Sequence, residues 1–257
     1  MSLAIIVSGI LRNMKNASSS WKFDGDYHLV TENMIYKTQS RIEELTLYEN
    51  MNIVNDSFVN FRTINICMDT DIHDKVDLNL KSHPTINMSW KWKVAYNNIL
   101  PYYNILNYDR ILLIRPDMYV INLKTTNILN TIEIKDRQIH MLSTISLPTN
   151  SNQSPWMSDM FMLMNIKTFE IISSFYDYYI EMYKHKSKND VHNLFAEYIL
   201  KNDIIVTDEL SDYYSYFTLR GDASDFMFEN GVLNKKYTYQ ELESVNDEYY
   251  KKLWGIL

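Results

Sequence analysis

The sequence predicts one α/β domain whose central, mostly parallel sheet is covered by helices on both faces. Three observations predict it. Aliphatic runs such as Leu3–Val7 and Ile111–Ile114 have no polar face, which is typical of strands buried on both sides. Segments with helical periodicity lie between such runs. No repeat, low-complexity tract or Pro- and Gly-rich linker divides the chain, so residues 1–257 form one predicted domain.

The individual elements follow from the same patterns. Strands are expected, in chain order, at residues 3–8, 27–31, 62–67, 110–115, 138–144, 159–164 and 203–207. Residues 190–202 have apolar side chains at the spacing of a helix, and Asp190 is placed to cap it. Residues 166–183 show a similar spacing. A third helix is expected over residues 88–106, with Pro101 ending or kinking it.

Composition narrows the classes of partner and compartment. The formal net charge is -7 and no Lys- or Arg-dense stripe offsets it, so nucleic acid is not expected as a partner. The single cysteine, Cys67, cannot form an internal disulfide and is expected to be a buried thiol. The opening apolar run lacks a preceding basic region, and no segment approaches the length of a membrane span. We therefore expect a cytoplasmic protein.

Ligands of a parallel sheet bind beyond the carboxyl ends of its strands, so the residues that follow the strands are candidates for a site. After the first strand, Gly9 lets the backbone turn tightly and approach a ligand, and Arg12 supplies donors suited to a phosphate or a base edge. Ser8 precedes the turn. The alternative is an ordinary glycine turn with a solvent-facing arginine.

The second candidate is the triplet Arg115-Pro116-Asp117, at which the strand 110–115 stops. Pro116 cannot donate a hydrogen bond to the sheet, so the strand ends there and Asp117 is presented beside Arg115. A carboxylate in this position can bind a hard divalent cation, and such a cation typically holds a diphosphate. The alternative is that Arg115 and Asp117 pair with each other.

The third candidate follows the long Ser-, Asn- and Pro-rich loop at residues 147–155. Asp159 opens an apolar strand there, three residues after Trp156. An aromatic ring can stack on a sugar while a neighbouring carboxylate accepts a proton from a hydroxyl group. Trp156 is thus a candidate for acceptor binding. The alternative is a core tryptophan beside an acid that merely starts a strand.

Four segments together resemble a known family: SGILRN (8–13), WKWKVAYNNIL (90–100), YDRILLIRPDMYV (108–120) and WMSDMFMLMNIKTFEII (156–172). In this order they are similar to the nucleotide-sugar-dependent GT-A glycosyltransferases of large DNA viruses and of bacterial clusters for surface-polysaccharide biosynthesis. The resemblance covers roughly residues 3–205. It implies a GT-A (Rossmann-like) sheet, a UDP- or GDP-sugar donor, and Mn²⁺ or Mg²⁺ as cofactor.

The resemblance also implies roles for single residues. Ser8, Gly9 and Arg12 would line the nucleotide pocket, and Lys93 and Arg115 would face the diphosphate. Asp117 would be the metal ligand and Asp159 the catalytic base. The family usually shows Asp-x-Asp at the metal site, whereas here Arg115 stands in the first position. A literal Asp-x-Asp occurs at residues 69–71, where it is an alternative metal site.

The preferred interpretation is a glycosyltransferase that moves a hexose from a nucleotide-diphosphate sugar to a glycan acceptor, as part of viral or bacterial glycosylation. Asp159 would deprotonate the acceptor hydroxyl if the reaction inverts the anomeric centre. A retaining enzyme would not need this base. The alternative from another class is a non-catalytic module of the same fold that holds a nucleotide or a glycan. A nucleotidyltransferase ranks last, because SGILRN contains only one glycine.

Overall fold

The central sheet of the protein contains seven strands. The computed structural model describes residues 2–11, 13–38, 41–67, 84–106, 108–125, 127–142, 155, 157, 161–185, 191–220 and 225–227. The strands are β1 (Ser2–Ser8), β2 (Asp26–Glu32), β5 (Phe61–Cys67), β6 (Tyr108–Ile114), β8 (Gln138–Met141), β9 (Phe161–Met164) and β10 (Ile205–Thr207). Their spatial order is β10-β8-β9-β6-β1-β2-β5. Strand β9 is antiparallel to both neighbours, and every other adjacent pair is parallel. The predicted α/β class with a mostly parallel sheet is confirmed.

Each expected strand is found where the structure describes the chain. Strand β6 begins at Tyr108 and ends at Ile114, one residue before the predicted end. The predicted strand 138–144 is described as far as residue 142, and residues 159–160 of the next lie outside the described part. Residues 3–7 of β1 and 111–114 of β6 are at most 2% exposed, which explains why these apolar runs could be recognised in the sequence.

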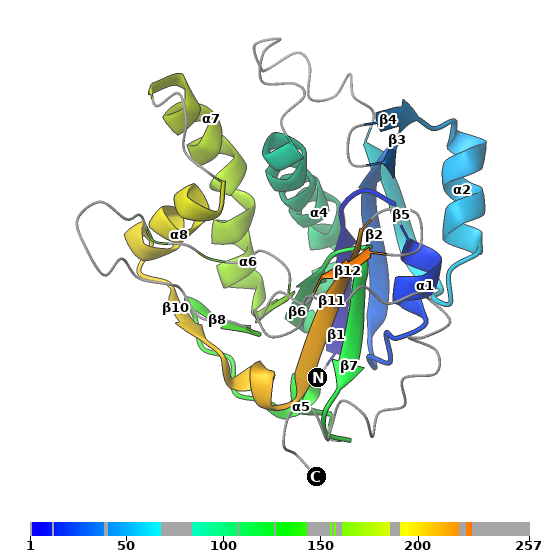
Figure 1. Ribbon diagram of the computed structural model, residues 1–257. Coiled ribbons are helices and arrows are strands. Elements are labelled where there is room, and N and C mark those ends of the chain that lie inside the picture. Colours follow the sequence, from blue (N-terminus) through cyan, green and yellow to red (C-terminus); the bar gives the residue numbers. More distant parts are fainter. Residues whose placement is uncertain are drawn as a thin grey trace.

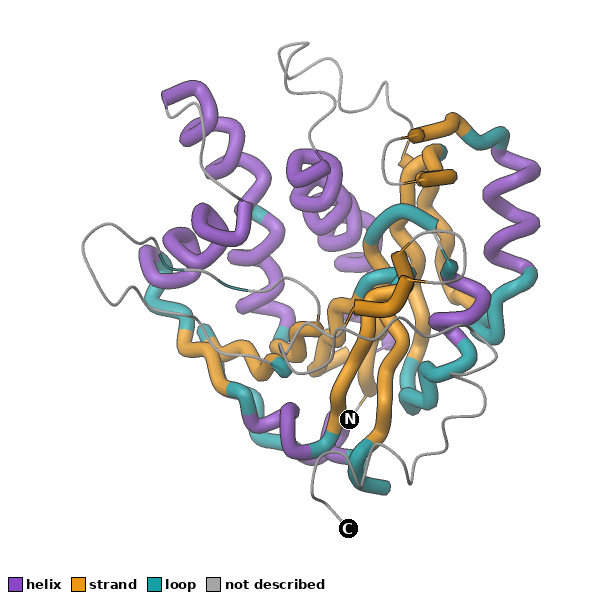
Figure 2. The backbone as a smooth tube through the Cα atoms, viewed as in Figure 1, coloured by secondary structure: helices purple, strands orange, loops and turns teal. Residues whose placement is uncertain are grey.

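Helices cover both faces of the sheet (Figures 1 and 2). One face carries α4 (Pro84–Leu106), α6 (Ile166–Ser173), α7 (Phe175–His185) and α8 (Val191–Lys201), and the other carries α1 (Met14–Ser18) and α2 (Leu47–Asn55). The core against α4 includes Trp92, Phe169 and Phe195, whereas the opposite core includes Met14 and Val54. The sheet therefore separates two apolar cores.

One helix prediction is wrong. The predicted helix 166–183 is two helices that meet at Ser174. The hydroxyls of Ser173 and Ser174 both donate to the carbonyl of Glu170, at 2.7 and 3.3 Å, and such bonds compete with the backbone bonds of a continuing helix. The expected helix over residues 88–106 is confirmed as α4, which continues past Pro101 to Leu106.

A smaller sheet lies outside the central one and was not predicted. Its order is β12 (Asp225–Met227), β11 (Tyr214–Arg220) and β7 (Met118–Asn122), with antiparallel pairing. The loop after α1 anchors β7, because Trp21 Nε1 donates to the Met118 carbonyl at 2.6 Å and Ser20 Oγ accepts from Val120 N at 2.8 Å. The remaining elements are the hairpin of β3 (Met34–Thr38) and β4 (Arg41–Glu44), α5 (Ile128–Thr131) and the 3₁₀ helix η1 (Glu209–Asp212).

Candidate functional site

The strand order creates a switch point between β1 and β6. In chain order the parallel strands β1, β2 and β5 are added outward on one side, and the chain then returns to add β6 on the other side of β1. This 3-2-1-4 order is that of Rossmann-like sheets, in which ligands bind outside the carboxyl ends of the strands where the order reverses. Val7 of β1 is opposite Ile114 of β6, so the residues that follow both strands meet at this point.

Gly9 and Pro116 bring these two strand ends into contact. Gly9 has φ 151°, a conformation that other residues rarely adopt, and its N–H donates to the Val30 carbonyl at 3.2 Å. A Cβ atom at Gly9 would lie 2.7 Å from Pro116 Cδ, well inside contact distance. The close approach of the two turns therefore requires glycine at this position.

Arg115 and Asp117 form a bidentate ion pair at the switch point. Arg115 Nε donates to Asp117 Oδ1 at 3.0 Å and Nη2 donates to Oδ2 at 2.8 Å. The Asp117 side chain is 2% exposed and that of Arg115 is 20% exposed. The pairing considered as an alternative in the sequence is thus present, and the buried carboxylate orients the guanidinium of a partly exposed side chain. Two parallel N–H···O bonds give such a pair a defined orientation.

Ser8 adds a buried hydroxyl beside this pair. Along β1, Ala4 and Ile6 belong to the core on the α4 side, and by strand alternation Ser8 lies on the same face. Ser8 is 2% exposed, and its Oγ has no hydrogen-bond partner within the described parts of the chain. Leaving a buried hydroxyl unpaired costs free energy, so its presence at the end of β1 suits a site where a ligand supplies the partner.

The start of β9 lies at the same edge of the sheet. Phe161, the first residue of β9, is opposite Ile114, the last residue of β6. Because β9 is antiparallel, its first residue lies at the edge where the parallel strands end. Asp159 and Trp156 are two and five residues before Phe161 in the chain, outside the described residues. Arg12 is also outside them, so the predicted roles of these three residues stay predictions.

Lys93 has a different partner from the expected diphosphate. Its Nζ lies 2.6 and 2.7 Å from the two carboxylate oxygens of Asp177 on α7, and 5.5 Å from the centre of the Tyr176 ring. The side chains of Lys93 and Asp177 are 30% and 59% exposed. This pair ties α4 to α7 near the surface. A role of Lys93 in nucleotide binding stays a prediction.

A second ion pair at this edge of the sheet was missed in the sequence. Glu32 ends β2 and accepts from Lys91 Nζ at 3.0 Å and from Asn87 Nδ2 at 2.9 Å, and all three residues are buried. Asn87 and Lys91 lie one turn apart on α4, so the cluster fastens this helix to the end of β2. The available signal was an acid directly after the apolar stretch of β2, together with a lysine in the helix predicted to pack on the sheet.

The described residues do not fit a divalent cation at Asp117. Both of its oxygens accept from Arg115, and within the described parts of the chain no three His, Cys, Asp or Glu residues form a group that could hold a metal. Cations such as Mg²⁺ and Mn²⁺ are held by oxygen ligands, and a neighbouring guanidinium repels them. The alternative Asp-x-Asp at residues 69–71 lies outside the described residues.

Two buried histidines lie in polar networks away from this edge. His28 Nε2 is 3.2 Å from the Tyr108 hydroxyl, which donates to Asp26, and His28 Nδ1 is 2.9 Å from Thr63 Oγ1. Burial, opposed by Asp26, lowers the pKa of His28 to about 4. The network thus holds a neutral imidazole whose two nitrogens both have partners.

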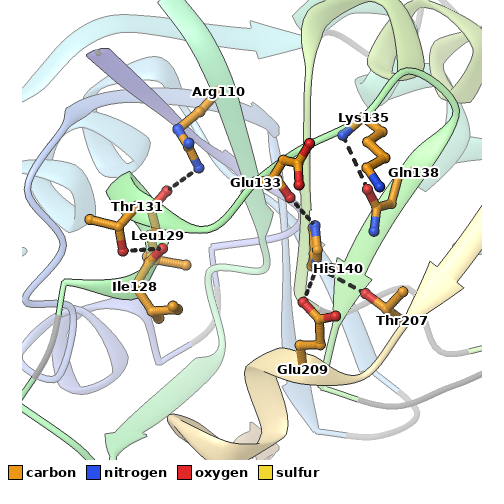
Figure 3. Close-up of polar contacts among 10 residues, drawn as sticks. All are labelled: Arg110, Ile128, Leu129, Thr131, Glu133, Lys135, Gln138, His140, Thr207 and Glu209. Atoms are coloured by element: carbon orange, nitrogen blue, oxygen red, sulfur yellow. Dashed lines mark hydrogen bonds and ion pairs between the residues drawn. The ribbon is translucent and has the colours of Figure 1, made fainter.

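His140 of β8 has a comparable environment, shown in Figure 3. Its Nε2 is 2.9 Å from the Glu133 carbonyl, and its Nδ1 is 2.8 Å from Thr207 Oγ1 and 3.3 Å from a Glu209 oxygen. Burial lowers the pKa of His140, although Glu133 and Glu209 oppose the shift. These contacts join β8 to β10 and η1. A third histidine, His192 of α8, is half-buried, and its Nδ1 lies 3.1 Å from the Met157 carbonyl.

Similarity to known proteins is confined to solved structures. No protein-family model and no curated protein matches the chain. Among solved structures, the chain is similar to the crystal structure of the galactosyltransferase LgtC in complex with donor and acceptor sugar analogues. The TM-score is 0.45 and the sequence identity 11%, over 80% of this chain and 73% of that chain. At these values no residue role is carried over from LgtC.

In the described parts of the chain, no helix is both long enough and apolar enough to span a membrane. Cys67 is buried, as expected.

Proposed function

We propose that the protein is a GT-A type glycosyltransferase that takes a hexose from a UDP- or GDP-sugar and transfers it to a glycan acceptor. One observation carries the proposal: three of the four segments that resemble this family lead to one edge of the sheet. Ser8 ends β1 and Gly9 follows it, Arg115 to Asp117 follow β6, and the antiparallel strand β9, which begins two residues after Asp159, starts beside them. The switch point between β1 and β6 is where such a sheet binds a nucleotide.

In this proposal the residues of the site have different roles. Gly9 allows the backbone to come close to a nucleotide, and the buried Ser8 hydroxyl is available for a hydrogen bond to it. Arg115 presents a guanidinium suited to a diphosphate. For an inverting reaction, Asp159 would accept the proton of the acceptor hydroxyl, while Trp156 would stack on the acceptor sugar.

The proposal is tested by incubating the protein with a panel of UDP- and GDP-sugars and measuring the release of free nucleotide. Asp159→Asn should lower release by roughly 10²-fold or more, because the amide cannot accept a proton at neutral pH, while donor binding is retained. Asp136→Asn, in an exposed ion pair with Lys167, is the matched control and should leave release unchanged. Near-normal release in Asp159→Asn would remove this residue as the base and favour a retaining reaction.

A non-catalytic module that binds a nucleotide or glycan is the second candidate. The pairing of Asp117 with Arg115, where the family usually has two acids, favours it. Binding of UDP or GDP in calorimetry, with no release of nucleotide from any sugar of the panel, would support this candidate over the transferase.

A further inference from the structure

The charge arrangement at the switch point differs from that of a metal site. The carboxylate of Asp117 is 2% exposed and faces the guanidinium of Arg115 through both oxygens. A cation that used these oxygens would have to displace the guanidinium or sit against its positive charge. The exposed partner of the pair is the cation, so the group that meets a ligand here is Arg115.

Arg115 has the chemistry to bind a diphosphate without a metal. The guanidinium of Arg115 is planar, and two of its N–H groups hold it against the carboxylate of Asp117. Its fork matches the spacing of phosphate oxygens, and it stays charged at all physiological pH values. Asp117 restricts its rotation before a ligand arrives, which lowers the entropy lost on binding.

We infer that Arg115, and not a divalent cation, binds the diphosphate of the donor, and that Asp117 is a positioning residue which holds the guanidinium in place. This inference rests on the proposed function. Because Asp117 balances the charge of Arg115, the pair offers directed hydrogen bonds more than net attraction. Lysine, which lacks the planar fork, should therefore be a poor substitute for Arg115.

The first measurement is titration calorimetry of UDP and GDP with the full chain, in EDTA and in Mn²⁺. We expect the affinity of whichever nucleotide binds to agree within about twofold between the two conditions, since phosphate recognition by arginine needs no metal. An affinity at least about tenfold weaker in EDTA would overturn the inference and leave the glycosyltransferase proposal standing. No binding of either nucleotide in either condition would overturn both.

The second measurement tests whether Asp117 acts on nucleotide binding through Arg115. The affinity is measured in EDTA. Asp117→Asn should weaken nucleotide binding by about tenfold there, because one charge-assisted hydrogen bond to the guanidinium is lost. A residue that serves only as a metal ligand would show no effect in EDTA. An unchanged affinity would therefore overturn the positioning role.

The third measurement separates recognition from folding. Arg115→Lys should lower the affinity by about tenfold despite its retained charge.

Removing Arg115 alone would leave a buried carboxylate unpaired, so the double variant Arg115→Gln with Asp117→Asn is used, which keeps the shape and removes both charges. It should unfold at nearly the temperature of the parent yet bind nucleotide at least about tenfold more weakly. The matched control, Lys167→Gln with Asp136→Asn, removes an exposed pair and should bind normally. Equal affinity of parent and double variant would overturn the inference.

Discussion

Two ion pairs lie at the carboxyl ends of β2 and β6, the strands on either side of β1, and they differ in how far their side chains are exposed to solvent. In the pair of Lys91 and Glu32 both side chains are sealed, at 3% and 4% exposure. In the pair of Arg115 and Asp117 the acid is sealed and the cation is 20% exposed. The sealed pair can only hold elements together, whereas the half-open pair also presents a cation at the switch point. Position in the sheet alone thus does not identify a binding residue.

The comparison predicts its largest effect for the sealed pair. Lys91→Met would leave Glu32 buried without its cation, and we expect a loss of about 3–5 kcal/mol in the free energy of unfolding. Urea denaturation measures it. The double variant Lys91→Met with Glu32→Leu should recover most of this loss, because apolar residues can replace a buried pair. A loss below about 1 kcal/mol in the single variant would show that this pair is no more sealed than a surface pair.

Gly9→Ala tests the pair of Arg115 and Asp117, because Gly9 contacts Pro116 between them. Alanine would be strained at φ 151°, and its Cβ would push against the ring of Pro116. We expect a loss of at least about 1–3 kcal/mol in the free energy of unfolding, and weaker nucleotide binding because Pro116 lies between Arg115 and Asp117. Thermal denaturation and calorimetry check the two effects. An unchanged melting temperature would mean that the two turns are not in close contact.

The pH dependence of stability limits the conditions under which the pairs can be compared. The native state favours neutral His28, with a pKa of about 4, whereas the unfolded chain takes up a proton near pH 6.5. The contribution of His28 to the free energy of unfolding is therefore fully present above about pH 6.5. It falls as the pH decreases towards 4, by about 2 kcal/mol between pH 7 and pH 5. The lowered pKa of His140 acts in the same direction.

Urea denaturation at a series of pH values measures this dependence, and His28→Gln should flatten it, since glutamine does not titrate. A parent protein as stable at pH 5 as at pH 7 would contradict the buried, neutral state of His28. The ion-pair variants are best compared at pH 7 or above, where the contribution of His28 to the free energy of unfolding is nearly constant.

The smallest effect is expected for the exposed pair of Lys93 and Asp177. Because these side chains are 30% and 59% exposed, Lys93→Ala should lower the free energy of unfolding by only about 0–1 kcal/mol. Lys167→Ala, from another exposed pair, is the control of equal type. Calorimetry of UDP and GDP gives the second result: a tenfold loss would place Lys93 at the diphosphate, whereas unchanged affinity would leave it as a tie between α4 and α7.

Much of the central sheet could be predicted because its strands are buried on both faces. The runs in β1 and β6 are apolar without interruption, and the meeting of their carboxyl ends followed from parallel pairing. The direction of β9 could not be read, because an apolar run is the same in either orientation. Strand β7 was missed because its partners are distant in the sequence. It pairs with β11, and its backbone is hydrogen-bonded to the side chains of Trp21 and Ser20.

The candidate site was predicted less completely than the sheet. The sequence placed Ser8, Gly9, Arg115 and Asp117 at strand ends, where the structure brings them together. It left open whether Asp117 pairs with Arg115, since distance and burial depend on the turn between them. It missed the contact of Lys91 with Glu32, because burial of a lysine depends on how α4 packs. The spacing of WKWK gave no sign of which lysine turns inward.

The turn of Arg115, Pro116 and Asp117 is also the place where the chain passes from one sheet to the other. Strand β7 begins directly after Asp117, and its first residue, Met118, is paired with Thr218. During synthesis the strands β1, β2, β5 and β6 emerge well before β11. Until residues 214–220 have been made, β7 can contact Trp21 and Ser20 but lacks its partner strand. Pairings so distant in sequence form slowly. The switch point should thus be among the last parts of the protein to reach its final shape.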